Sequence, residues 1–433
     1  MNNETTQFPD LKAEIAAAIA ASSQGQLTIK RIAVHPRPHL EEILALWLLR
    51  NFGKGRYPGI HCAKLEFWGS GQSTPDGRPV AQHEADGTLV LGIALAKLDD
   101  HRLRLQDPDV ITCSAQLVAN SLGIAEDPAL GKILTYVSRQ DSRGGAQPFD
   151  LAHLVRILHD RYPDDPREVI YWAFKAISAK YEEQVRFLGP SRQAWAQRAS
   201  VRTLQFPDGT VLRVGSIVGD DPLFHRMARF YGKCDLFVQQ GTPAAPNCGN
   251  TQIYVSQHLK VPGTVIGSLG RQVGRNHPSH QVVESISRMV SALHPERLQG
   301  VASSQDMPPV LRQFAEVLLR DRKRSDCWWA TCAIARRLRM EEYRRAGAKP
   351  PDDTQRLTST TVADRPEWHL TPQAGWIFNG STTARGVPAT RIPLPDIHRE
   401  VRRALVPLEW RETLRVADAP AIVPSATPGG DAP

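Results

Sequence analysis

Hydrophobic and polar residues follow two different patterns along the chain, and the change falls near residue 200. In the first part, apolar runs typical of buried strands cover residues 27–34 (LTIKRIAV) and 87–96 (GTLVLGIALA). After each run, apolar residues recur every three or four positions, which is the spacing of a helix face. Residues 27–190 therefore alternate strand and helix, which predicts an α/β domain with a parallel sheet flanked by helices.

The helical spacing is clearest directly after the first predicted strand. There Ile43, Leu44, Trp47 and Leu48 form an apolar face, and Gly53 ends the segment. The predicted helices cover residues 10–22, 41–52, about 114–121, 127–141, 151–158 and about 166–187.

Beyond residue 200 the pattern changes to short strands separated by turn residues. Residues 201–218 (VRTLQFPDGTVLRVGSIV) predict a hairpin that turns at the sequence PDG. Residues 234–240 (CDLFVQQ) and 250–256 (NTQIYVS) are two further strand candidates, and residues 308–345 are helical and basic. We therefore expect a second, smaller α+β domain after the first.

Composition divides the rest of the chain, and we find no internal repeat. The end, ADAPAIVPSATPGGDAP, is rich in proline, alanine and glycine, which is typical of disorder. The predicted segments are 1–26 (N-terminal helix), 27–195 (α/β domain), 196–300 (α+β domain), 301–345 (basic helical segment), 346–414 (C-terminal segment with an aromatic motif) and 415–433 (disordered tail).

The overall composition is that of a globular chain, since 41% of the 433 residues are hydrophobic and 23% are charged. The formal net charge of +8 favours acidic partners, because a basic surface attracts polyanions. A phosphorylated small molecule or a nucleic acid fits this description. The sequence leaves open whether two copies form a homodimer.

Cysteine usage and the first residues bear on location. The six cysteines are too few for a disulfide framework and contain no C-x-x-C pair, which favours a reducing cytoplasm and no structural zinc. The first residues lack the basic start of a signal peptide, and no apolar run approaches the length of about 18 residues that spans a membrane. We therefore expect a cytoplasmic protein without a membrane partner.

The stretch HPRPHLEE joins the first predicted strand to its helix and holds His35, His39 and Glu41. Binding sites in open α/β sheets collect at the carboxyl ends of strands, which is where His35 lies. Two prolines stiffen the loop, and imidazole with carboxylate suits manganese, zinc or iron. The same residues also fit an ordinary helix start, where acidic residues oppose the helix dipole. Glu42 is expected at the helix cap or on the surface.

A second cluster, Asp99, Asp100 and His101, follows the second predicted strand and occupies the equivalent place in the next strand–helix unit. By itself this cluster would be interpreted as a charged loop. Asp141, after a predicted helix and before Gly144, is a third candidate, although an aspartate there is most often a cap or turn residue. The HPRPHLEE motif, the Asp99 cluster and Asp141 therefore indicate a metal site only when they are taken together, in this order along the chain.

In this order, the motifs H-x3-H-x-E, D-D-H and a later Asp resemble the DHH-like phosphoesterases, which include RecJ-type exonucleases and manganese pyrophosphatases. The resemblance covers residues 27 to about 190. It implies hydrolysis of a phosphodiester, as in a nuclease or nucleotide phosphodiesterase, with one or two divalent ions, Mn²⁺ or Mg²⁺. The implied metal ligands are His35, His39, Glu41, Asp99, His101 and Asp141, and the implied catalytic residues are Asp100 and His101.

The chain departs from the pattern of this family at four positions. His39 and Glu41 stand where the family has aspartates, and Asp100 stands where it has the first histidine of its signature. Gly92 occupies the place of an aspartate on the preceding strand. Two further functions stay open for these reasons. One is a degenerate DHH-like domain that binds a nucleotide or nucleic acid without cleaving it, and the other is a structural partner protein that uses the aromatic C-terminal segment.

The second half of the chain offers candidate substrate contacts. In IGSLGRQVGRNHPSH, the side chains of Arg271, Arg275 and His277 lie among three glycines and suit an acidic substrate, with an exposed turn as the alternative. The aromatic motif EWHLTPQAGWIFNGSTT (367–383) fits either substrate stacking or a small hydrophobic cluster. The basic helix at 320–345 fits either phosphate contacts or a solvated face.

Overall fold

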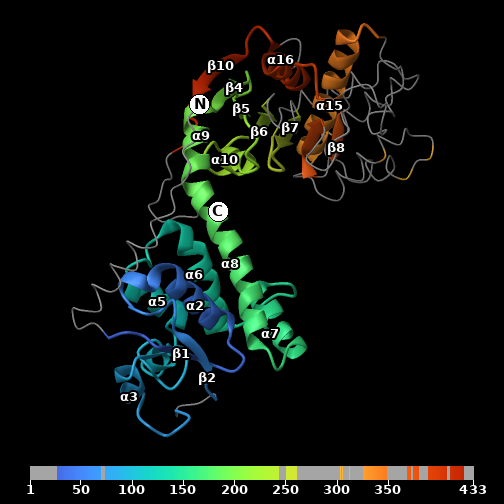
Figure 1. The fold of residues 1–433 in the computed structure, drawn as a ribbon. Coiled ribbons are helices and arrows are strands. Elements are labelled where there is room, and N and C mark those ends of the chain that lie inside the picture. The colour runs from blue at the N-terminus through green and yellow to red at the C-terminus, as the bar shows by residue number, and fades with distance from the viewer. Residues whose placement is uncertain are drawn as a thin grey trace. The chain divides into compact units, whose positions relative to one another are not determined.

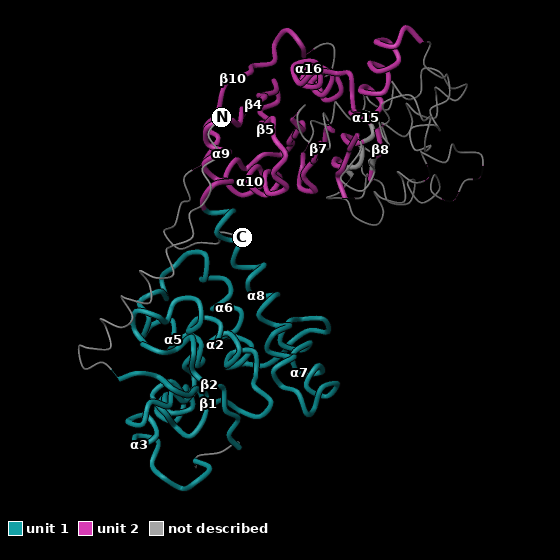
Figure 2. Tube along the Cα trace, viewed as in Figure 1, with its two compact units in different colours: residues 1–188 teal, residues 189–433 magenta. Residues whose placement is uncertain are grey.

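The structure of the chain is a computed structural model that divides into two compact units, residues 1–188 and 189–433 (Figure 2). The predicted helix at 10–22 lies outside the described residues. No described helix combines the length and the apolar composition that crossing a membrane requires. The structure describes residues 27–69, 74–242, 250–260, 325–348, 368–371, 374–379, 389–406 and 410–423, and the single residues 303, 305 and 312.

Unit 1 is built on a three-stranded parallel sheet, so the predicted mixture of helices with a parallel sheet is confirmed (Figure 1). Its strands are β1 (Arg31–Val34), β2 (Lys64–Phe67) and β3 (Thr88–Val90), in the order β2-β1-β3. Strand β1 is central and pairs in parallel with both neighbours. Strand β2 was not predicted, because four partly exposed residues are too few to show a period.

The strands are shorter than the apolar runs that predicted them. The run at 87–96 leaves the sheet early, because Gly92, Ala94 and Leu95 have positive φ values of 64°, 60° and 52°. Such values lie in the left-handed region, which turns the backbone away from an extended path. Strand β3 therefore ends at Val90, and a tight turn separates it from the predicted acidic cluster.

The helices of unit 1 confirm five of the predicted segments. Helix α6 begins where the sequence indicates, because the Asp127 side chain caps it by accepting a hydrogen bond of 2.8 Å from the amide of Ala129. The helices are α2 (Leu40–Phe52), the 3-10 turn η1 (Gly53–Gly55), α3 (Val80–Ala85), α4 (His101–Arg104), α5 (Ser114–Leu122), α6 (Pro128–Arg143), α7 (Leu151–Arg161) and α8 (Pro166–Leu188).

Helix α2 is the centre of the unit 1 core. Ile43, Leu44, Leu46, Leu48 and Leu49 are each 2% exposed or less, so the helix is buried around its circumference. It packs against α5, α6, α7 and α8. Burial on all sides fixes the position of its first turn, which carries the acidic residues of HPRPHLEE.

Unit 2 is built on a seven-stranded mixed sheet of order β10-β4-β5-β6-β7-β9-β8. Only the pair β5–β6 is parallel, and a short helix, α10, connects these two strands. The predicted hairpin at 201–218 is confirmed as the antiparallel pair β4–β5. The strands are β4 (Ser200–Gln205), β5 (Val211–Val218), β6 (Leu236–Gln240), β7 (Thr251–Val255), β8 (His369–Thr371), β9 (Trp376–Asn379) and β10 (Arg415–Ala419), and the helices are α9 (Pro190–Arg198), α10 (Phe224–Phe230), α15 (Ser325–Arg345) and α16 (Leu394–Leu405).

Two predictions about the end of the chain are wrong. Residues 415–419 form β10 and pair with β4, although the sequence predicted a disordered tail from residue 415. Strands β8, β9 and β10 also join the sheet of β4 to β7, so the predicted segments from 196 to 414 are not separate. The reason is that these strands are stabilised by pairing with distant segments, and the local amino-acid composition does not reveal such pairing.

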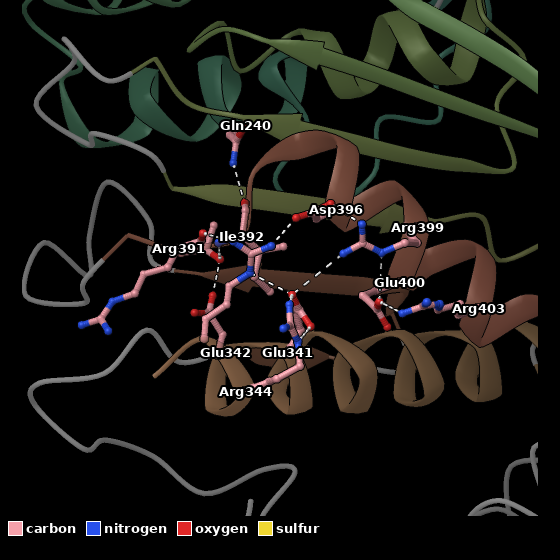
Figure 3. Close-up of polar contacts among 12 residues, drawn as sticks. Gln240, Glu341, Glu342, Arg344, Arg391, Ile392, Asp396, Arg399, Glu400 and Arg403 are labelled. Atoms are coloured by element: carbon pink, nitrogen blue, oxygen red, sulfur yellow. Dashed lines mark hydrogen bonds and ion pairs between the residues drawn. The ribbon is translucent and has the colours of Figure 1, made fainter. Parts of the chain in front are cut away.

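The basic helix predicted within 308–345 is confirmed by α15, and several of its described arginines form ion pairs. Figure 3 shows a network between α15 and α16, in which Glu341 accepts hydrogen bonds from Arg344 (2.6 Å) and Arg345 (2.8 Å). Arg345 also binds Asp396 of α16. These contacts hold two helices of unit 2 together. The arginines in them are paired with acidic residues, so part of the positive charge of the basic helix is already neutralised.

Candidate metal site

The two acid and histidine motifs lie at the carboxyl ends of neighbouring strands. His35 directly follows β1. After β3 the chain forms an isolated parallel bridge between Leu91 and Leu98 and then reaches Asp99. Since β1 and β3 pair in parallel, their carboxyl ends open at the same edge of the sheet. The placement of both motifs at this edge is what the sequence predicted.

The first candidate group consists of His39, Glu41 and Asp141, whose ligand atoms lie within 4.8 Å of one another. His39 is the cap residue of α2, and Glu41 lies in the first turn of that helix. Asp141 lies in the last turn of α6, so the prediction that it follows the helix is wrong. Helix α6 continues two residues past Asp141, to Arg143.

Glu41 is the buried residue of this group. It is 4% exposed, and its Oε2 atom has no hydrogen-bond partner among the described residues. Burial raises the pKa of Glu41 well above its usual range, and the charges of Glu42, Asp141 and Asp100 raise it further. A divalent cation would favour the ionised carboxylate and give Oε2 a partner, so the group fits a metal ion.

The second candidate group, Asp99, Asp100 and His101, has its own ligand atoms within 4.8 Å of one another. Its carboxylates already bind protein groups. Asp99 Oδ2 accepts from the amide of Leu95 (2.8 Å), and Asp99 Oδ1 accepts from the amide of His101 (3.0 Å) and lies 2.8 Å from Nδ1 of the same residue. Asp100 Oδ1 accepts from Ser114 Oγ at 3.0 Å. Asp100 Oδ2, like Glu41 Oε2, is buried without a hydrogen-bond partner among the described residues, but it has the ion pair with Arg104 that Glu41 lacks.

Arg104 connects the two groups, although the sequence analysis did not single it out. Its Nη2 atom lies 2.8 Å from Asp100 Oδ2 and also binds Asp141 Oδ2. Nη2 further donates to the carbonyl oxygen of Thr112 (2.9 Å) and to Ser142 Oγ (3.3 Å). A fixed positive charge therefore lies between the two aspartates. Its spacing of four residues from Asp100 was the available signal.

His35 lies beside the site but outside both groups. Its Nδ1 is 3.0 Å from Glu42 Oε1, and this hydrogen bond raises the pKa of His35. Glu42 Oε2 accepts from the amide of His39 at 2.9 Å and so takes part in the capping box of α2. The predicted cap role of Glu42 is confirmed, but the side chain is buried and not on the surface. Glu42 therefore orients the loop and engages both the amide and Nδ1 of His35.

Gly92 lies against the two glutamates of α2, Glu41 and Glu42. A Cβ atom at this position would lie 2.9 Å from Glu42 Cγ and 3.3 Å from Glu41 Oε1. The closest contact is with Glu42, so the turn after β3 has room for a glycine at position 92 but for no larger side chain.

A cleft of about 980 Å³ opens beside the first group, and His39, Glu41 and Asp141 line it. Other lining residues come from α7 and from the loop before α2. His159 is tied to that loop, since its Nε2 lies 3.0 Å from the carbonyl oxygen of Pro38. The cleft therefore combines candidate metal ligands with groups that attract an anion. The lining arginines are Arg156 and Arg37, the second of which binds Asp160, and the lining also holds His153 and His159, with the pKa of His159 lowered by burial.

The predicted contacts of the second half have different outcomes. Arg271, Arg275 and His277 lie outside the described residues. In the aromatic motif, Trp368 is 6% exposed and belongs to the core of unit 2, and Trp376 packs against Tyr254 with ring centres 5.2 Å apart. The described part of the motif therefore fits the hydrophobic-cluster alternative.

No family model, no curated protein and no solved structure matches this chain.

Proposed function

We propose that unit 1 is a divalent-metal-dependent phosphoesterase, with His39, Glu41 and Asp141 as ligands of an Mn²⁺ ion. The observation that carries the proposal is the convergence of their ligand atoms within 4.8 Å, beside a buried oxygen of Glu41 that has no described hydrogen-bond partner. One imidazole and two carboxylates suit Mn²⁺ better than Mg²⁺, which prefers oxygen ligands. When bound, such an ion polarises a phosphoryl oxygen and lowers the pKa of a coordinated water.

We assign proton transfer to His101. Asp99 Oδ1 lies 2.8 Å from its Nδ1, which leaves Nε2 as the nitrogen that exchanges a proton with substrate or water. The side chain of His101 is 59% exposed, so a bound substrate can reach it. Asp100 is 1% exposed and is held by Ser114 and Arg104, so we assign it a positioning role in place of the predicted catalytic one.

The substrate that fits the cleft is a phosphodiester, such as a nucleotide or an oligonucleotide. Arg156 Nη2 lies 3.2 Å from His153 Nδ1, so two basic side chains of α7 are held together on the cleft wall. Donors in this arrangement suit phosphate oxygens. The order of the motifs at one edge of a parallel sheet supports a DHH-like phosphoesterase, with Arg104 and Gly92 as the features particular to this chain.

The test is hydrolysis of bis(p-nitrophenyl) phosphate and of short oligonucleotides by the full chain, first stripped of metal and then titrated with Mn²⁺. We expect activity to appear with Mn²⁺ and to fall at least 100-fold in His39→Ala and Asp141→Asn. His61→Ala removes an exposed histidine of the same unit and serves as the matched control. Activity that is unchanged by the metal, or by both site variants, would contradict the proposal.

One observation favours a second candidate, a domain that binds a nucleotide or nucleic acid without cleaving it. Arg104 already neutralises part of the charge of Asp100 and Asp141, which a metal ion would otherwise do. In that case the cleft would bind an anion through its basic wall and would need no ion. Binding of a labelled oligonucleotide that is unchanged by a chelator, with no hydrolysis at any Mn²⁺ concentration, would select this candidate.

A further inference from the structure

The acidic groups that meet at Arg104 carry a net negative charge. Glu41, Asp100 and Asp141 are three carboxylates, and all three act electrostatically on Arg104. Arg104 supplies one positive charge, so the sum is −3 + 1 = −2 when all three carboxyls are ionised. One divalent ion makes this cluster neutral. A second ion would leave a charge of +2 beside buried carboxylates, which is unfavourable in a weakly polar interior.

The position of Arg104 also removes ligand atoms from a second ion. The second candidate group would need Asp100, but Asp100 Oδ2 lies 2.8 Å from Arg104 Nη2 and its Oδ1 accepts from Ser114. The guanidinium is not a loose surface cation, because the carbonyl oxygen of Thr112 and Ser142 Oγ also accept from it. An ion that entered this group would have to displace a charge with several bonds to the protein.

We propose that Arg104 takes the place of a second divalent ion, so that the site holds one ion and one guanidinium. This inference rests on the proposed metal site at His39, Glu41 and Asp141. A guanidinium supplies a permanent positive charge and hydrogen-bond donors towards a phosphate, and it needs no free metal in solution. The site therefore responds to a single Mn²⁺ ion, and the side chain of Arg104 supplies the second positive charge.

The test is the number of Mn²⁺ ions bound per chain. The full chain is stripped with a chelator, loaded with Mn²⁺, separated from unbound metal by gel filtration and measured by elemental analysis, with isothermal titration as a second readout. We expect one ion in the native protein and two in Arg104→Gln, because the change frees Asp100 Oδ2 and lowers the cluster charge to −3. Arg102→Gln, an exposed neighbour in α4, should keep one ion.

Charge-paired variants separate the effect of charge from damage to the fold. In Arg104→Gln with Asp100→Asn, the cluster keeps a charge of −2 and should hold one ion, and Arg104→Lys should also hold one. If Arg104→Gln does not fold, as seen by circular dichroism, the paired variant is decisive, since two ions there would overturn the inference.

Each other outcome has a distinct meaning. Two ions in the native protein, or one in a folded Arg104→Gln, overturn the role of Arg104 and leave the proposed function standing. No ion in the native protein together with one in Arg104→Gln supports the second candidate function and overturns the one-ion site. No ion in either protein overturns the metal site itself, and the inference with it.

Discussion

A Cβ atom at Gly92 would lie 2.9 Å from Cγ of Glu42, so the turn after β3 and the first turn of α2 are packed with no room for another side chain. The φ of Gly92 is +64°, which also disfavours any other residue. The carboxyl edge of the sheet is therefore closed by two glutamates from α2, and the backbone after β3 is shaped to accept them.

Gly92→Ala should destabilise unit 1 by about 2–4 kcal/mol, the sum of backbone strain and overpacking. Urea unfolding followed by circular dichroism measures the loss. Gly77→Ala is the matched control, because Gly77 has a similar φ of +72° but nothing within 4 Å of the added methyl group. The control should show the backbone cost alone, about 1–2 kcal/mol. Equal losses in the two variants would mean that contact with the glutamates is unimportant.

Glu42→Gln should cost about 2–3 kcal/mol of stability, because a buried carboxylate that accepts from both His35 and His39 is replaced by an amide with one acceptor. Glu168→Gln offers a comparison, since Glu168 is an exposed acidic residue in the first turn of α8. Its loss should stay within about 0.5 kcal/mol. The two free energies of unfolding, measured in urea at pH 7, test this difference directly.

Phe149→Gly should stabilise the protein by about 0.5–1 kcal/mol, which is opposite to the usual effect of glycine. Phe149 has a φ of +70°, and the residue is 87% exposed, so glycine relieves strain and loses little packing. Phe149→Ala keeps the strain and should be close to neutral. If the glycine variant had a lower thermal unfolding midpoint than the alanine variant, the backbone at Phe149 would not be strained.

Glu341 should make the stability of unit 2 sensitive to acid. Hydrogen bonds from Arg344 and Arg345 lower the pKa of Glu341 to about 2, whereas the unfolded chain has the ordinary value near 4.5. The folded-state pKa is depressed, so the stabilisation is fully present above pH 4.5 and is lost as the pH falls towards 2. Because the arginines are partly exposed, we expect a loss of about 1–2 kcal/mol. Glu341→Gln should remove this part of the pH dependence between pH 5 and 2.5.

The positions of candidate site residues that follow from local spacing could be predicted, whereas contacts between distant segments of the chain could not. His39, Glu41 and the Asp99 cluster were located, because the ends of apolar runs mark the carboxyl edge of a parallel sheet. Arg104 was missed, since its partner Asp141 is 37 residues away and the two meet only in the folded unit. The packing of Gly92 on α2 likewise depends on a tertiary contact, which the order of residues along the chain does not show.

The pairing of β10 with β4 also orders events during synthesis. The three described strands of unit 1 are present once residue 90 has been made, whereas β4 gains its second neighbour only when residues 415–419 follow. Roughly 200 residues separate these two strands, which a ribosome takes about 10–40 s to add. Throughout that interval β4 presents an open strand edge, of the kind that pairs with other chains. Partial products that stop before β10 keep this edge, so interrupted synthesis yields an aggregation-prone unit 2 in a chain whose unit 1 already has its three described strands.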